Sequence, residues 1–187
     1  QLCPDYPECL SEEDLGYQDT TDCDGEVEIE IYLNTGANLI SFYALPDDVS
    51  IDAIFTEVAD GSGVIGQGVG AIKLNGQWYG SLIEIYQDDG YWVKVAEATT
   101  LNLGDSYPVN YDADGEVTYS IEFGNNLISY PFETSQLLGD ALGEAVAYTY
   151  AIAGQGMAAL NTGTELGGED GWAGSLTVFE GGNGYWL

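Results

Sequence analysis

The sequence predicts a mainly β protein with two tandem homologous modules, each built from a small antiparallel sheet and one short helix. Short segments with alternating apolar and polar residues are separated by Gly, Asn-Gly and Asp-Gly turn signals, which is typical of antiparallel strands. Five sequence blocks also occur twice in the same order, which indicates a repeated module. The paired blocks are 22–27 and 112–117, 36–42 and 124–130, 66–68 and 154–156, 78–82 and 172–176, and 90–92 and 184–186.

The repeats divide the 187 residues into four segments. Residues 1–21 carry a dense series of acids with Pro and Cys but no apolar periodicity, so we expect an extended acidic arm. Residues 22–97 are β module 1 and residues 112–187 are β module 2. Residues 98–111 are expected to be a linker, because Gly and Pro interrupt them.

Module 1 starts with the clearest strand pattern of the chain. Every second residue of 26–33 is apolar and most of the others are acidic, which predicts a strand with one face in water. A second strand is expected over residues 38–44. After it, Ser50 is an N-cap residue for a short helix, because the apolar residues that follow have helical spacing. These residues are Ile51, Ile54, Phe55 and Val58.

The rest of module 1 reads as β structure. Residues 64–74 form a Gly-interrupted β segment, and Asn75-Gly76 is a strong hairpin signal before Trp78 begins the return strand. Strands over 83–86 and 91–95 complete the module. Module 2 repeats this plan, with strands expected over 117–121 and 126–132, a helix through Leu138, Ala141, Leu142 and Ala145, a β segment over 147–153 and a hairpin over 172–179.

The charge balance is strongly acidic. Against 32 acidic residues stand only Lys73 and Lys94, so the formal net charge is −30. Self-repulsion of this size opposes compaction unless salt or divalent cations screen it, which suits a marine, saline or calcium-rich exterior. The charge argues against nucleic acid or an anionic membrane as partner. No apolar run approaches the ~20 residues of a membrane-spanning helix, so membrane insertion is not expected.

The three cysteines, Cys3, Cys9 and Cys23, all lie in the first 23 residues. We interpret them as a structural disulfide formed in an oxidising compartment, with the third thiol free or paired elsewhere. A bond from Cys3 or Cys9 to Cys23 is favoured over a Cys3–Cys9 loop, since module 2 has Ala113 where module 1 has Cys23.

Two acidic turns are the candidate metal sites. Asp22, Asp24 and Glu26 surround Gly25, and Asp112, Asp114 and Glu116 repeat the pattern around Gly115. Each set offers several hard oxygens to Ca²⁺, although the spacing is not that of an EF-hand loop. The alternative is a simple Asp-Gly turn that leads into a strand.

The repeated aromatic residues are candidates for ligand binding. Adjacent residues on a strand point to opposite faces, so one residue of each Tyr-Trp pair is expected in the core and the other on the surface. Exposed Trp92 and Trp186 would form a stacking surface for sugars, whereas burial is the alternative for aromatic residues in a small module.

Catalysis is not expected from this sequence. The chain has no His for a Ser-His or Cys-His pair, and it has no phosphate-binding loop. Acidic pairs for glycoside hydrolysis stay an open alternative, because their separation in space is not given by the sequence.

The series Gly-x-Asn-Leu-Ile-Ser, Trp-x-Gly-Ser-Leu and Gly-Tyr-Trp resembles short tandem β modules of secreted, surface-attached and phage proteins of marine microbes. The resemblance covers about 22–97 and 112–187, and it implies a location and an assembly role but transfers no site. We therefore expect a non-catalytic extracellular structural or adhesive protein on a cell surface or virion exterior, a self-assembling subunit of a fibre, sheath or virion. A carbohydrate-binding module, with Ca²⁺ as its one candidate cofactor, is the alternative.

The expected partner is another copy of the chain, in a homo-oligomer or polymer held together by the acidic arm or by a strand edge. Glycans are the alternative partner.

Overall fold

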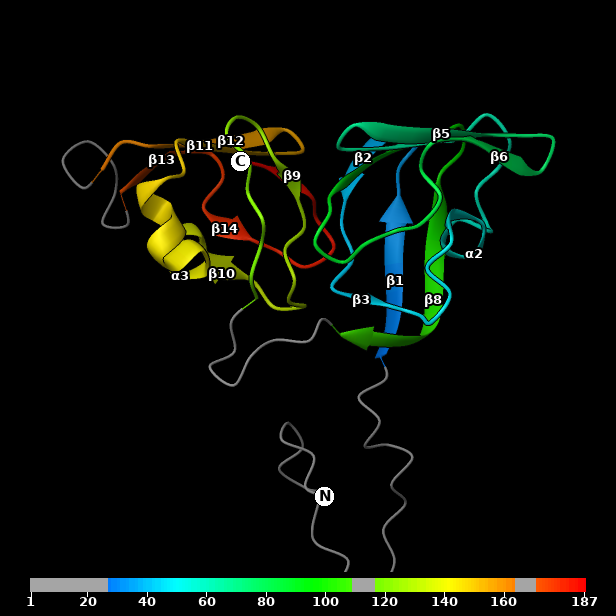
Figure 1. Cartoon of the computed structure of the whole chain (residues 1–187), viewed down its shortest axis with the longest axis horizontal. Helices are drawn as coiled ribbons and strands as arrows, with labels where there is room; N and C mark the ends of the chain where they lie inside the picture. The colour runs from blue at the N-terminus through cyan, green and yellow to red at the C-terminus, as the bar shows by residue number, and fades with distance from the viewer. Residues whose placement is uncertain (1–26, 109–116, 164–170) are drawn as a thin grey trace, which may run out of the picture.

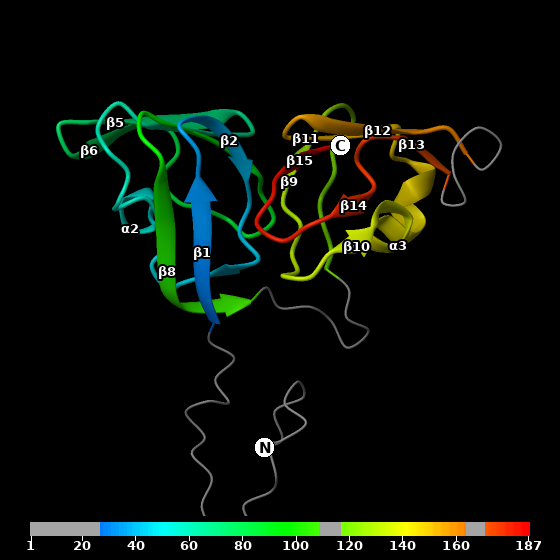
Figure 2. The same ribbon diagram turned by 180° about the vertical axis from the view of Figure 1, so that it is seen from behind.

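A computed structural model of the chain describes residues 27–108, 117–163 and 171–187. The described part is mainly β, as the sequence predicts, with short antiparallel strands in several sheets and two short α-helices (Figure 1). Two five-stranded sheets form the upper layer of the molecule in Figure 1 and, from behind, in Figure 2. We call them the N-terminal sheet and the C-terminal sheet.

The two sheets have corresponding strand orders. The N-terminal sheet runs β2 (Gly36–Ile40), β7 (Tyr91–Val95), β4 (Gly63–Gly66), β5 (Val69–Leu74) and β6 (Gln77–Gly80). The C-terminal sheet runs β9 (Leu127–Ile128), β15 (Tyr185–Trp186), β11 (Ala151–Gly154), β12 (Met157–Asn161) and β13 (Trp172–Gly174). In each sheet, the strand that comes last in the sequence lies between the first and second strands of that sheet. The repeated sequence blocks therefore occupy equivalent positions in the two sheets.

Local signals position the strands and the helix of the N-terminal half. Asn75 and Gly76 both have positive φ, 52° and 75°, as the Asn-Gly hairpin between β5 and β6 requires. The helix α2 (Ile51–Ile54) begins after Ser50, whose side chain accepts a hydrogen bond from the Ala53 N–H. The four apolar residues predicted for its inner side are all buried, namely Ile51, Ile54, Phe55 and Val58.

A second sheet lies below the N-terminal sheet, with the order β1 (Val27–Leu33), β8 (Thr99–Pro108) and β3 (Ala44–Leu45) (Figure 1). The alternation predicted for β1 is confirmed, since Ile29, Ile31 and Leu33 are buried and the intervening residues are exposed. The stretch expected as a linker, 98–111, contains β8 instead. Leu101 and Leu103 on β8 face the core, which explains why this segment pairs with β1.

The C-terminal half is smaller. Its remaining elements are β10 (Gln136–Leu137), which pairs with β14 (Val178–Phe179), the helix α3 (Leu138–Leu142) and a 3₁₀ turn at Gly143–Ala147. The predicted helix is confirmed at Leu138, Ala141 and Leu142, whereas Ala145 lies in the 3₁₀ turn and is exposed. The helix α3 has no side-chain cap.

Several strand predictions were wrong. Residues 172–179 are not a hairpin, because β13 pairs with β12 and β14 pairs with β10. Residues 117–121 form no strand, since no segment of the described chain pairs with them as β8 pairs with β1. Residues 83–86 make only a single bridge, between Glu84 and Ser50. The second strand of each half is shorter than predicted, ending at Ile40 in β2 and at Ile128 in β9.

Each half has its own apolar core on the lower side of its five-stranded sheet. In the N-terminal half the ring of Phe42 contacts Phe55 edge-on, with 6.2 Å between the ring centroids, and lies at the same centroid distance from the ring of Tyr91. In the C-terminal half the ring of Tyr185 packs edge-on against Phe179, with 4.6 Å between the centroids. Within the described residues, no helix is long and apolar enough to span a membrane.

The Trp-x-Gly-Ser-Leu blocks end the edge strands β6 and β13. In the first, the N–H groups of Ser81 and Leu82 both donate to the Gly70 carbonyl, and Ser81 Oγ accepts from the Gly70 N–H. The second copy repeats these bonds between Ser175, Leu176 and Ala158. The backbone passes so close to the neighbouring strand that only Gly fits before the Ser.

We predict that Gly80→Ala destabilises the protein by about 1–3 kcal/mol, because a Cβ at Gly80 would collide with the Gly70 carbonyl and would lie 2.6 Å from Ala71 Cα. The measurement is the melting temperature, with Gly104→Ala on β8 as control, since a Cβ at Gly104 meets nothing within 4 Å. Equal melting temperatures for the two variants would contradict this explanation of the motif.

Candidate functional site

The sequence-predicted site residues have two different outcomes. The candidate metal ligands Asp22, Asp24, Glu26, Asp112, Asp114 and Glu116 and the three cysteines lie outside the described residues. The calcium-site and disulfide hypotheses therefore stay predictions. Within the described ranges, no group of three or more His, Cys, Asp or Glu side chains is placed to hold a metal ion.

Trp92 and Trp186 lie within the described chain and occupy equivalent positions. Tyr91 and Tyr185 are buried in the two cores, whereas Trp92 and Trp186 are half-buried on the opposite, upper side of the sheets. Each Tyr hydroxyl also accepts a backbone hydrogen bond, from the Tyr86 N–H and the Glu180 N–H respectively. The structure thus places both Trp residues on one side of the molecule.

The two sheets are joined by a reciprocal set of contacts. Gln155 Oε1 accepts a hydrogen bond from the Leu39 N–H at 2.8 Å, and Gln155 Nε2 donates to the Ala37 carbonyl at 3.1 Å. In the opposite direction, Gln67 Oε1 accepts from the Leu127 N–H at 2.7 Å, and its amide group donates to the Asn125 carbonyl at 3.5 Å. Each Gly-Gln-Gly block therefore binds the Asn-Leu-Ile-Ser block of the other half.

The Gly-Tyr-Trp blocks complete this joint. The Gly184 N–H donates to the Leu39 carbonyl, and the Gly90 N–H donates to the Leu127 carbonyl. A Cβ at Gly90 would lie 2.7 Å from the Ile128 carbonyl oxygen, and a Cβ at Gly184 would lie 2.6 Å from that of Ile40. Both positions therefore require Gly for the halves to meet.

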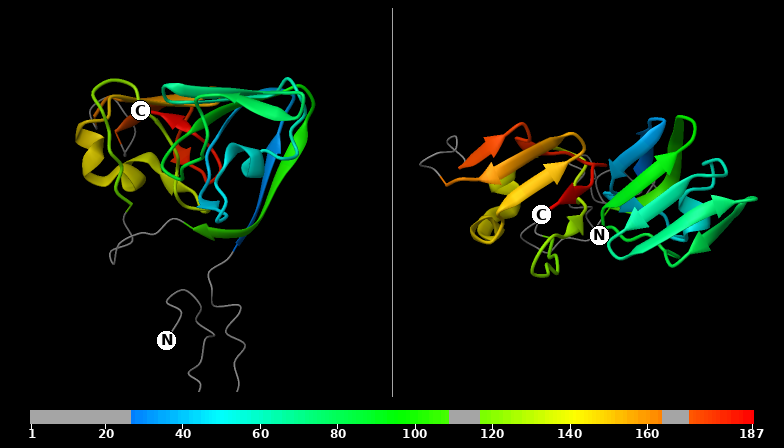
Figure 3. Two further views of the ribbon diagram at one scale, coloured as in Figure 1. Left: turned by 45° about the vertical axis from the view of Figure 1, so that its right-hand side comes forward. Right: turned by 90° about the horizontal axis from the view of Figure 1, so that it is seen from above.

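Buried serines and leucines fill the remainder of the joint. The Ser41 hydroxyl donates to the Asn183 carbonyl at 2.6 Å, and the Ser41 N–H donates to the Gly182 carbonyl. Leu39 and Leu127 are each only 2% exposed, yet neither belongs to the core of its own half. They lie on the upper side of the sheets, where the other half covers them. The two sheets consequently form one continuous layer (Figure 3, right).

Asn38 and Asn126 hold the start of the joined strands in matching ways. The Asn38 side-chain oxygen accepts from the Asn34 N–H and its amide nitrogen donates to the Asn34 and Gly36 carbonyls. Asn126 makes the same three bonds with Glu122 and Gly124. Both Asn side chains are buried, so these bonds satisfy polar groups that would otherwise be costly to bury.

The upper side of the two sheets, which we call the outer face, is the candidate functional surface. Neither helix of the described chain covers it, since α2 and α3 both lie below the sheets (Figure 1). Ile65 and Tyr79 are 59% and 52% exposed there. Strand alternation and register place the following side chains on it: Ala37, Ile65, Ile72, Leu74, Gln77, Tyr79, Trp92 and Lys94 from the N-terminal sheet, and Ala151, Ala153, Ala158, Leu160, Ala173 and Trp186 from the C-terminal sheet.

Among the described residues, the strands that form the outer face carry no acidic residue, although the chain as a whole has a formal charge of −30. None of the ten strands of the two sheets contains Asp or Glu, and neither do their connecting Gln-Gly and Asn-Gly turns. The one charged group is the cation Lys94. Lys73, the other cation, is used internally, because its ammonium donates to the carbonyls of Phe55 and Thr56.

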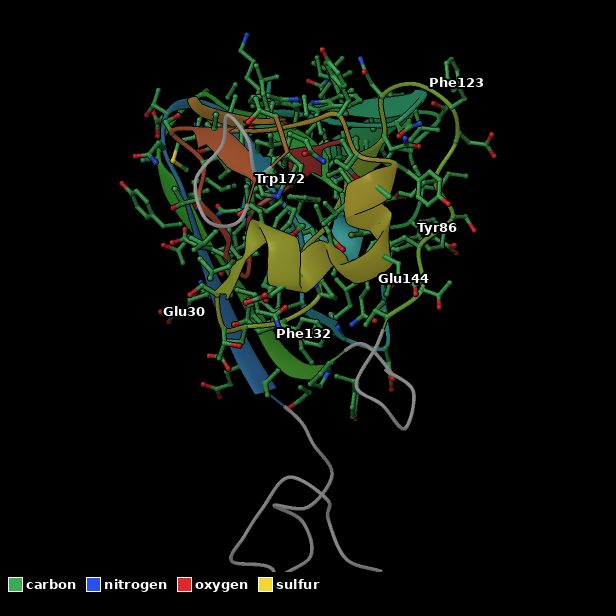
Figure 4. All side chains as sticks on the ribbon, turned by 90° about the vertical axis from the view of Figure 1, so that its left-hand side faces the viewer. Glu30, Tyr86, Phe123, Phe132, Glu144 and Trp172 are labelled. Carbon is green, nitrogen blue, oxygen red and sulfur yellow. The ribbon has the colours of Figure 1, made fainter. Side chains whose placement is uncertain are left out.

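Asp60 lies at the rim of this layer, where its Oδ1 accepts from the Gly76 N–H at the β5–β6 turn, and other acids of the described chain lie well away from it. Glu28 and Glu30 face outward from β1, beside the exposed Tyr32. In Figure 4, Glu30 and Glu144 lie well below the upper layer, while the fully exposed Phe123 lies level with it. The molecule thus has an apolar upper side and acidic flanks.

Asp88 and Asp89 lie at the joint itself. The Asp88 carbonyl accepts from the Ser129 N–H, and Asp89 forms a β-bridge with Ile128. Partial burial, together with the negative charge of Asp88, raises the pKa of Asp89, and a 3.5 Å contact from the Tyr91 hydroxyl opposes this shift. The equivalent residue in the other half is Asn183, which carries no charge.

Burial also raises the pKa of two tyrosines near the joint, Tyr119 and Tyr130, to about 12. The Tyr119 hydroxyl is 2.7 Å from Ser129 Oγ. Their phenols therefore stay neutral and serve as hydrogen-bonding groups.

Sequence reasoning missed both the joint and the acid-free face. The signal for the joint was present, since Gln67 and Gln155 recur inside the same Gly-Gln-Gly block and an exposed turn does not need a repeated Gln. The signal for the face was the absence of Asp and Glu from ten strand segments of a strongly acidic chain.

In comparisons with protein-family models, with curated protein sequences and with solved structures, nothing matches this chain. The functional argument therefore depends on the geometry of the chain itself, and the resemblance to marine surface modules stays a prediction.

We predict that Gln155→Ala and Gln67→Ala each destabilise the protein by about 1–2 kcal/mol, because each leaves the N–H of a buried Leu without its acceptor. Chemical denaturation of the full chain measures the loss. Gln77→Ala is the matched control, since the Gln77 side-chain oxygen accepts a hydrogen bond from the exposed Tyr79 hydroxyl of the same strand and lies away from the joint. A loss no greater than that of the control would show that the Gln contacts do not stabilise the joint.

We predict that Asp89→Asn raises the melting temperature at pH 7. The pKa of Asp89 is raised in the folded state above the ordinary Asp value of about 3.9. Between these two pKa values the folded state binds more protons than the unfolded state. The free energy of unfolding therefore falls as the pH rises through this window. The advantage of the variant should therefore disappear below the ordinary Asp pKa. Melting from acid to neutral pH measures this, with Glu28→Gln on β1 to correct for the change in net charge. A gain in melting temperature that does not depend on pH would contradict this explanation.

Proposed function

We propose that this chain is a non-catalytic extracellular structural or adhesive protein, a self-associating subunit of a surface fibre, sheath or virion exterior. The observation that supports the proposal most directly is the outer face. A continuous, exposed apolar surface on a strongly charged protein is typical of an interaction site, because such patches are otherwise rare on soluble monomers. Interface centres are likewise enriched in aromatic residues and depleted of acids.

The charge distribution supports the extracellular setting. Charges on the acidic flanks repel another copy over a screening length of about 10 Å at 0.1 M salt, and only about 3 Å at 1 M. A saline or cation-rich medium therefore allows close approach, whereas a dilute medium opposes it. The N-terminal cysteines suit an oxidising compartment.

Open strand edges offer a second way to associate. The strands β6 and β13 lie at the far edges of the two joined sheets, and edge strands are common sites of pairing between chains. Both are short, at four and three residues, which limits the strength of edge pairing. We therefore regard the outer face as the principal contact.

The second candidate function is carbohydrate binding. It is favoured by one observation, that Trp92 and Trp186 lie at equivalent positions on the same face of the two joined sheets. Flat aromatic surfaces of this kind stack on sugar rings. In either function, Ca²⁺ would bind at the acidic turns at 22–26 and 112–116.

We predict that the full chain self-associates as salt increases. Sedimentation velocity at about 0.01 M and about 0.5 M NaCl should show a shift from monomer to larger species, because the screening length falls from about 30 Å to a few ångströms. CaCl₂ at matched ionic strength tests the calcium hypothesis, since only site binding would promote association beyond screening. The same samples are incubated with insoluble polysaccharide. A monomer at all salt concentrations that pellets with the polysaccharide would replace the assembly proposal with the carbohydrate one.

A further inference from the structure

We propose that the outer face docks on the outer face of a second copy, sheet against sheet, with the N-terminal sheet of each copy over the C-terminal sheet of the other. This inference rests on the proposed function and specifies its contact surface and symmetry. It replaces the acidic arm or a strand edge as the principal contact between subunits.

The chemistry of the face favours an apolar partner over a glycan. Among the side chains that form it, only Gln77, Tyr79, Lys94 and the two indole N–H groups offer hydrogen bonds, and apart from Trp186 all of these come from the N-terminal sheet. Sugar hydroxyls placed over the C-terminal sheet would lose water without gaining partners, which is costly. Apolar side chains of another protein face carry no such cost.

The charge distribution favours a second copy as this partner. Two chains of −30 repel each other wherever their acidic flanks meet. Over the outer face, the ten strands contribute no Asp or Glu from either copy. Face-to-face contact therefore brings the chains together with the acids at the rim, where solvent ions screen them.

The same surface already serves as a packing surface inside one chain. Leu39 and Leu127 lie on the outer side of their sheets and are buried by the opposite half. The outer face continues directly from them through Trp92 and Trp186, which are their register partners. A docked copy would extend this buried region on both sides of the joint.

The two halves differ in side-chain size at two corresponding positions of the outer face. Ile65 and Tyr79 of the N-terminal sheet correspond to Ala153 and Ala173 of the C-terminal sheet, whereas Ile72 and Leu160 are large in both halves. Stacked sheets lie about 10 Å apart with interdigitating side chains, and large residues pack best opposite small ones. A two-fold dimer places the N-terminal half of each copy over the C-terminal half of its partner, which makes two equivalent contacts.

The test uses two variants of the full chain, Ile65→Glu and Ala153→Lys, studied alone and mixed in equal amounts. Each variant alone introduces a charge into both contacts of a two-fold dimer, and we expect its self-association to weaken by at least about a hundredfold. In the mixed dimer one contact is native and the other contains a Glu–Lys pair, so mixing should restore association. Melting curves verify that each variant is folded.

Tyr32→Glu on β1 is the matched control, because Tyr32 is 62% exposed among acids on the opposite flank and should be neutral for association. If the parent chain associates and Ile65→Glu has no more effect than this control, the face-to-face inference is wrong while the assembly function stands. Weakening by both variants without restoration on mixing overturns the crossed arrangement of halves. A parent chain that stays monomeric at high salt overturns the proposed function itself.

Discussion

The reciprocal joint between the two halves is the constraint on which the rest of the arrangement depends. Gln67 and Gln155 each reach across to bind the first strand of the opposite sheet, and Gly90 and Gly184 allow the backbones to approach. Most of the repeated blocks contribute to it, which gives their repetition a physical reason. A module that pairs with its own copy must carry both sides of the contact, so the same residues recur in each half.

Joining the sheets creates a surface that neither half has alone. Each sheet covers a core on its lower side, with Tyr91 and Tyr185 at the centres. Because the joint fixes the two sheets side by side (Figure 3), their upper sides, with mainly apolar strand residues, combine into one extended layer. A larger flat surface makes a more specific contact than two separate small ones, since both parts must fit at once.

Charge segregation explains how such an acidic chain retains an apolar face. In the described chain the acids lie on β1, at Asp105 of β8, in the loops and in the helical segments, and the strands of the two five-stranded sheets carry none. The Lys73 ammonium donates to a carbonyl at the C-terminal end of α2. At the equivalent position of the other half, the Asn161 amide donates to carbonyls in and just after the 3₁₀ turn. With few cations for ion pairs, the fold is held by apolar packing and by hydrogen bonds to the backbone. Its stability then depends on burial rather than on charge pairing.

The sequence by itself determined the features that depend on near neighbours. The alternation of β1, the turn at Asn75-Gly76 and the cap at Ser50 follow from local periodicity and backbone preference, and the division of Tyr91 and Trp92 between two faces follows from strand geometry. Tertiary structure alone decided which strands pair: β8 formed where a linker was expected, residues 117–121 formed no strand, and the Gln residues met the opposite half. Strand pairing joins residues far apart in sequence, so local patterns cannot specify the partner. For the same reason, only the folded chain shows that its acid-free strands share one face.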